Sequence, residues 1–104
     1  GARFFFLPQS AAKTPHQTGE NAVPAPKLYL VLEMGLGAQA ALEAALVAAP
    51  IASVLLVPAA GETLQPQTLK AAVEAIQRRN IAALVADDAD LARIVRADGV
   101  HLMW

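Results

Sequence analysis

The sequence contains no cysteine, few charged residues and no long apolar run, and each of these absences excludes a class of protein or site. Without cysteine there are no disulfides, thiolate metal sites or cysteine nucleophiles, which suits a reducing compartment and predicts a cytoplasmic protein. No apolar run approaches the roughly 20 residues that cross a bilayer. The run Phe4–Leu7 is too short for a secretory signal, so no membrane partner is expected.

Charge is sparse and balanced. Charged residues make up 16% of the chain, the formal net charge is −1, and the basic residues are scattered. Nucleic-acid-binding proteins carry a concentrated basic surface, so no nucleic-acid partner is expected. The pair Arg78 and Arg79 is interpreted as the solvated end of a helix, where the helix dipole favours cations.

What the chain does have is a regular alternation of apolar segments. Hydrophobic residues make up 56% of it, which suits a parallel sheet that is buried on both faces. Strands are predicted at Leu28–Leu32, Ile51–Val57, Ile81–Val85 and Val100–Leu102, and helices at 38–49, 66–79 and 89–95. Strict alternation of strands and helices predicts an α/β fold of parallel (βα) repeats.

The first 26 residues differ in composition. They hold several prolines among polar residues, Pro8, Pro15, Pro24 and Pro26, and predict an irregular arm over 1–26 that precedes a domain at 27–104. Three adjacent aromatic residues, Phe4 to Phe6, are the exception in this arm. We expect them to dock on an apolar surface, either of this domain or of a partner.

Candidate functional residues follow the third predicted strand. Asp87 and Asp88 come directly after the apolar run Ile81–Val85, at the carboxyl end of a strand, where α/β sheets place their ligands. The alternative is that one of them caps the following helix. Asp98 is interpreted as a residue that stabilises a turn. His101 is interpreted as a packed, hydrogen-bonded imidazole in preference to a ligand.

A glycine pair follows the first predicted strand of the repeats. Gly35 and Gly37 form Gly-x-Gly, but the third glycine of the dinucleotide-binding fingerprint is missing. An ordinary loop between strand and helix is therefore favoured over a nucleotide site.

Three segments together resemble a known enzyme family. LYLVL at Leu28–Leu32, VADDADLA at Val85–Ala92 and ADGVHL at Ala97–Leu102 are similar to the amino-terminal half of thiamine-phosphate synthase. The resemblance covers residues 27–104 and implies about half of a (β/α)₈ barrel. A complete barrel needs about 200 residues or more, so the pattern predicts either part of a barrel or a small open sheet.

The resemblance also implies a chemistry. The family is a magnesium-dependent transferase that joins hydroxymethylpyrimidine diphosphate to a thiazole phosphate and releases pyrophosphate. It implies Asp87 as a ligand of Mg²⁺, and Ala86, Asp88 and His101 as residues that bind substrate phosphates or the pyrimidine. The family has Asn before this aspartate, where the present chain has Ala86. It has Gly-Gln after ADGVHL, where the present chain has Met103 and Trp104.

The second strand departs from the family pattern, which leaves two further functions open. Leu55, Val57 and Ala59 stand where the family has Gln, Arg and Lys. These apolar residues favour a non-catalytic relative that binds small-molecule phosphates or a protein through the same strand ends. The other alternative is a module whose exposed sheet edges pair with a second copy, so a homo-oligomer is expected.

Overall fold

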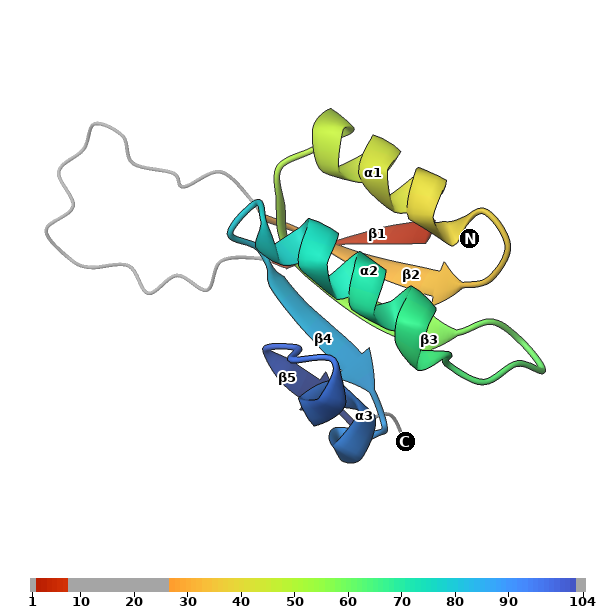
Figure 1. Cartoon of the computed structure of the whole chain (residues 1–104). Helices are drawn as coiled ribbons and strands as arrows, with labels where there is room; N and C mark the ends of the chain where they lie inside the picture. The colour runs from red at the N-terminus through yellow and green to blue at the C-terminus, as the bar shows by residue number, and fades with distance from the viewer. Residues whose placement is uncertain (1, 8–26, 103–104) are drawn as a thin grey trace, which may run out of the picture.

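A five-stranded sheet and three helices make up the described part of the protein. The computed structural model describes residues 2–7 and 27–102, which are coloured in Figure 1. The elements in chain order are β1 (Ala2–Leu7), β2 (Lys27–Met34), α1 (Ala38–Ala48), β3 (Ile51–Pro58), α2 (Pro66–Gln77), β4 (Ala82–Ala86), α3 (Ala89–Ile94) and β5 (Gly99–His101).

The strands lie side by side in sequence order, β1-β2-β3-β4-β5. Strands β2 to β5 are parallel, and a helix connects each of them to the next. This confirms the predicted parallel repeats and the α/β class. Right-handed crossovers between strands that follow one another without reversal place all helices on the same face of the sheet. Figure 1 shows α1 and α2 side by side across one face of the sheet.

The first strand corrects the prediction of an irregular arm. Residues 2–7 form β1, which pairs antiparallel with β2 from Ala2 opposite Leu32 to Leu7 opposite Lys27. Aromatic residues favour strands, but the partners of this strand lie 20 to 30 residues further along the chain, so no local pattern revealed it. The rest of the predicted arm, 8–26, lies outside the described residues. The backbone of Phe4 to Phe6 therefore pairs with its own sheet, and Phe4 remains 46% exposed.

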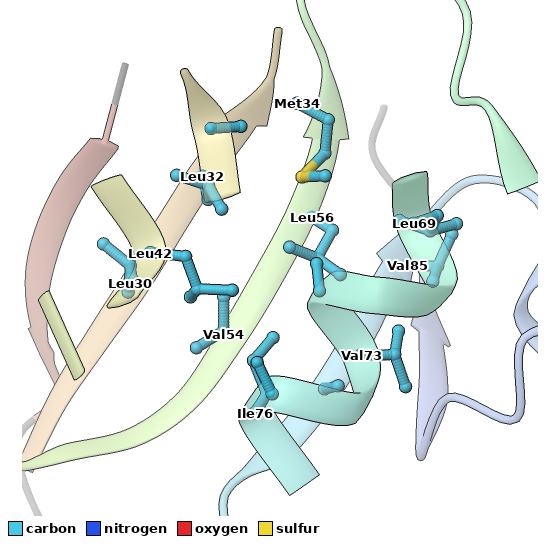
Figure 2. Packing of buried hydrophobic residues seen from close by; sticks show 14 of the residues in the cluster. Leu30, Leu32, Met34, Leu42, Val54, Leu56, Leu69, Val73, Ile76 and Val85 are labelled. Carbon is cyan, nitrogen blue, oxygen red and sulfur yellow. The ribbon is translucent and has the colours of Figure 1, made fainter. Parts of the chain in front are cut away.

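The main hydrophobic core fills the space between the sheet and the helices. Its largest fully buried side chains come from β2, β3, β4, α1 and α2, and all are labelled in Figure 2: Leu30, Leu32, Leu42, Val54, Leu56, Leu69, Val73, Ile76 and Val85. On α2 the buried residues recur at spacings of four and three, as the sequence predicted. Pro66 begins this helix, at a position whose missing N–H costs no helical hydrogen bond.

A second, smaller cluster lies on the other face of the sheet. It consists of strand residues: Val31, Leu55, Val57 and Ala86 are buried, and Tyr29 and Leu84 pack against them. Alternate residues of β2 and β3 thus enter the two clusters in turn, because successive side chains of a strand point to opposite faces. We call this surface the second face of the sheet.

Candidate functional site

The carboxyl ends of β4 and β5 meet at one rim of the sheet. Ala86 is in register with His101, and the backbone N–H of Asp87 donates to the carbonyl of His101 at 2.9 Å. This hydrogen bond joins the two segments, VADD and ADGVHL, that suggested a site in the sequence. The structure therefore places Asp87, Ala86 and His101 next to one another. Asp88 follows at the start of α3.

Asp87 occupies an unusual backbone conformation. Its φ is 60°, in the left-handed region, and its side chain is exposed at the rim. Aspartate and asparagine enter this region more readily than other residues with a side chain, because their short polar groups bond to the nearby backbone. The turn from β4 into α3 thus needs a residue of this type at position 87, whatever else its carboxylate does.

Asp88 caps α3, which confirms the capping alternative for this residue. One carboxylate oxygen, Oδ1, accepts the backbone N–H of Leu91 at 2.9 Å. Asp90 lies in the first turn of the helix and forms an exposed ion pair with Arg93. The cap occupies one oxygen of Asp88, and the other is available to a ligand at the rim.

His101 differs from its expected environment. Its side chain is exposed, whereas the sequence suggested a packed imidazole. The reason is its position on β5, which has only three residues and lies at an end of the sheet order. Because register partners in a sheet point to the same face, His101 lies with Ala86 on the second face, at the rim.

The structure adds one residue that the sequence did not single out. Glu33 is near the carboxyl end of β2 and is in register with Val57, so it too lies on the second face. Its carboxylate forms an ion pair with Arg3 of β1 at 3.7 Å. Neighbouring strands are about 4.8 Å apart, so Glu33 is roughly 10 Å from β4 along the rim. The sequence feature that could have identified Glu33 was a single acidic residue inside an otherwise apolar strand.

Strand β3 brings no charged side chain to this rim. Leu55 and Val57 are 3% and 7% exposed, and both belong to the apolar cluster of the second face. Ala59, the third position that the resemblance assigns to a polar side chain, follows the end of β3 and is partly buried. The second-face residues of β3 between Glu33 and His101 are thus apolar and buried. On the same face of the sheet, partial burial of the Tyr29 side chain raises the pKa of its hydroxyl above the usual value.

The described residues of the rim offer too few protein ligands to hold a metal without further ligands. No group of three or more His, Asp or Glu side chains within residues 2–7 and 27–102 is arranged to hold a metal ion. Mg²⁺ is commonly held by one or two carboxylates together with substrate phosphates, and it keeps several waters. The exposed carboxylates of Asp87 and Asp88 fit that second arrangement.

The loops that precede α1 and α2 form a groove at the same rim. It has a volume of about 330 Å³, and its walls include Met34, Leu36, Leu64, Thr68 and Leu69. The glycine pair lies in the loop between β2 and α1. Gly37 has a φ of 80° and precedes α1, and a Cβ on Gly35 would lie 3.2 Å from that of Ala59.

Asp98 lies at the opposite rim and has a structural role. Its Oδ2 atom accepts the backbone N–H of Ala83 at 2.8 Å and the side-chain amide of Gln77 at 3.2 Å. Its own N–H donates to the carbonyl of Ala83 at 2.8 Å. Asp98 therefore ties the amino end of β5 to β4, which sets the register that brings Ala86 beside His101.

Comparisons with protein-family models, with curated proteins and with solved structures found no match to this chain. Among the helices that the structure describes, none has the length and apolar character needed to cross a lipid bilayer. Function therefore has to be argued from the rim itself.

Proposed function

We propose that the chain forms half of a (β/α)₈ barrel of the thiamine-phosphate-synthase type. The proposal rests on the strand order, since parallel strands that follow one another with all helices on one face are the repeating arrangement of that barrel. A doubly wound sheet would instead reverse its order and place helices on both faces. In a barrel, the second face with Leu55 and Val57 lines the interior.

The activity that goes with this fold is transfer of a hydroxymethylpyrimidine group from its diphosphate to a thiazole phosphate. The observation that carries the proposal is the hydrogen bond between Asp87 and His101, which unites the two family-like segments at the carboxyl rim. A magnesium ion bound there would neutralise charge on the departing pyrophosphate. Asp87 would hold the ion, Asp88 would contact the phosphates through it, and His101 would contact the phosphates directly. The absence of cysteine supports a cytoplasmic setting.

Calorimetry tests this site. Titration of the protein with pyrophosphate in the presence of Mg²⁺ is compared for the wild type, Asp87→Asn and Asp90→Asn. Asparagine also tolerates the left-handed backbone at position 87, so this variant removes the charge without straining the turn. Asp90 is a matched control, because its carboxylate lies three residues away, is exposed and pairs with Arg93.

Loss of a charged ligand is expected to weaken binding at least tenfold, which corresponds to about 1.4 kcal/mol. We expect this loss for Asp87→Asn and a change of less than twofold for Asp90→Asn. Equal affinity in all three proteins, or no heat in the wild type, would contradict the proposed site.

The buried apolar residues of β3 favour a second candidate, a non-catalytic relative that binds the same phosphates. Loss of a single oxyanion-hole donor costs roughly 2.7 to 4 kcal/mol of transition-state stabilisation, and here Leu55 and Val57 stand in place of polar groups. Incubation with both family substrates, followed by measurement of released pyrophosphate, separates the candidates. Binding without release supports the non-catalytic relative, and release that Asp87→Asn abolishes supports the enzyme.

A further inference from the structure

A groove in the helix layer takes no part in the proposed site. It lies between α1 and α2, which Figure 1 shows side by side, and has a volume of about 300 Å³. Clefts that bind small molecules begin at about this size. Two apolar residues line it, Leu46 and Ala75, and each is only 6% exposed. The other lining residues are charged: Glu43, Arg78 and Arg79. The groove therefore combines a buried apolar part with charged sides.

Two neighbouring arginines form the α2 side of this groove. Arg78 is the C-cap residue of α2 and Arg79 follows it, so the pair lies at the end of a helix, as the sequence suggested. Both residues are exposed, and both line the groove. Ion pairs within the described residues involve Arg3 and Arg93, and neither Arg78 nor Arg79 forms one there. The guanidinium donors of this pair are thus free to bind an anion.

The α1 side supplies one negative charge and further apolar surface. Oε2 of Glu43 accepts a hydrogen bond from the side-chain amide of Gln39 at 3.1 Å. Val47 lies one turn further along, next to Glu43 on the helix surface, and is 72% exposed. With two guanidinium groups on the other side, the lining has one positive charge in excess. The negative end of the α2 dipole amounts to about half a charge, so it reduces this excess without cancelling it.

We propose that this groove binds a small organic acid, a molecule with one carboxylate on a short hydrocarbon chain. A guanidinium group presents its donors in a planar fork that matches the two oxygens of a carboxylate. The single negative charge of this ligand balances the excess charge of the lining, whereas a phosphate dianion would be repelled twice as strongly by Glu43. The hydrocarbon chain would lie against Leu46, Ala75 and Val47, out of contact with water.

The groove is separate from the proposed magnesium site. Arg78 and Arg79 precede β4, whereas Asp87 follows it, so the two places lie at opposite rims of the sheet. The proposal therefore does not depend on the proposed function. Asp87→Asn, which is expected to weaken binding of magnesium pyrophosphate, should bind the organic acid with the affinity of the wild type.

An NMR titration of the whole chain with hexanoate tests the groove. We expect saturable shifts of the backbone amide signals of Leu46, Ala75 and Arg79, with a dissociation constant on the order of 1 mM, because the ligand is small and the groove is open to solvent. Acetate has the carboxylate without the chain, and 1-hexanol has the chain without the charge. Each of these two should bind at least about tenfold more weakly than hexanoate.

Three variants test the role of the arginines. Arg78→Gln and Arg79→Gln each remove one guanidinium group from an exposed position, and each should weaken hexanoate binding at least about fivefold. Lys70→Gln is the matched control, because it removes a positive charge from an exposed position of α2 outside the groove lining. It should change the affinity by less than about twofold, since a distant exposed charge is screened by solvent.

Three results would overturn the proposal: no saturable shift with hexanoate, equal affinity for hexanoate and 1-hexanol, or equal losses in all three variants. A last titration separates a free acid from the end of a protein chain. The dipeptide N-acetyl-glycyl-leucine carries its carboxylate next to a peptide bond, and we expect it to bind more weakly than hexanoate. Tighter binding of the dipeptide would overturn the assignment to a small acid and indicate a protein partner.

Discussion

Asp98 offers the sharpest test of how the rim is assembled. Its Oδ2 atom accepts the N–H of Ala83 and the amide of Gln77, and Ala83 itself is fully buried. Asp98→Ala removes both acceptor contacts at once. The Ala83 N–H then remains in a partly buried position without this acceptor, at the point where β4 begins.

The expected loss of stability follows from these contacts. Hydrogen bonds to charged groups contribute about 1.5 to 3 kcal/mol, and a buried donor without a partner costs about 1 to 3 kcal/mol. The Gln77 contact is exposed and adds little. We therefore expect Asp98→Ala to lower the free energy of unfolding by about 2 kcal/mol. For a domain of this size, that corresponds to a fall in Tm of roughly 10 °C.

Urea denaturation followed by circular dichroism measures this difference. Asp98→Asn is the matched variant, since its amide oxygen can still accept the Ala83 N–H, and it should lose less than half as much. Asp90→Ala controls for loss of an exposed carboxylate and should change stability by under about 0.5 kcal/mol. If Asp98→Ala unfolds at the same urea concentration as Asp90→Ala, Asp98 does not tie β4 to β5 as described.

Three further predictions concern the cap, the core and a single titrating side chain. Asp88→Ala removes the acceptor of the Leu91 N–H and should cost about 1 kcal/mol in urea denaturation, whereas Asp88→Asn should be close to neutral; equal losses would contradict the cap. Leu56→Ala, at a fully buried position, should cost about 2 to 5 kcal/mol, and a loss below 1 kcal/mol would mean that the core is not packed as described. Tyr29 is the single tyrosine, and burial raises its pKa above 10.0, so ultraviolet titration should give a midpoint above that value. Because the pKa of Tyr29 is higher in the folded state than in the unfolded chain, the stability that depends on its protonated hydroxyl is complete below pH 10 and is lost as the pH rises through the folded value. A midpoint at or below 10.0 would contradict the raised pKa.

Local patterns in the sequence predicted most of the repeats. The apolar run Ile51–Val57 became β3, Pro66 began α2, and the acidic turn at Asp88 became a helix cap. Each of these features depends on residues within about four positions, where strand periodicity, proline geometry and capping act. The parallel order of the strands then followed from the rule that links alternating elements to crossovers.

What the sequence did not predict depended on partners far along the chain. Strand β1 was missed because its pairing with β2 crosses residues 8–26, and proline-rich composition dominated the interpretation. The exposure of His101 follows from its place on a three-residue strand at the end of the sheet order, which no pattern within ADGVHL encodes. The role of Glu33 at the rim required the register between β2 and β3. The magnesium and substrate roles of Asp87 and its neighbours stay predictions.

Binding of Mn²⁺ in place of Mg²⁺ tests the central claim most directly. A paramagnetic ion broadens the NMR signals of nearby amides, and the ion would be added together with pyrophosphate. The proposed site predicts the strongest broadening at the amides of Asp87, Asp88 and His101, and weaker broadening at Ala83 and Asp98 at the opposite rim. Broadening centred on Asp98, or uniform across the sheet, would contradict the assignment of this rim as the functional site.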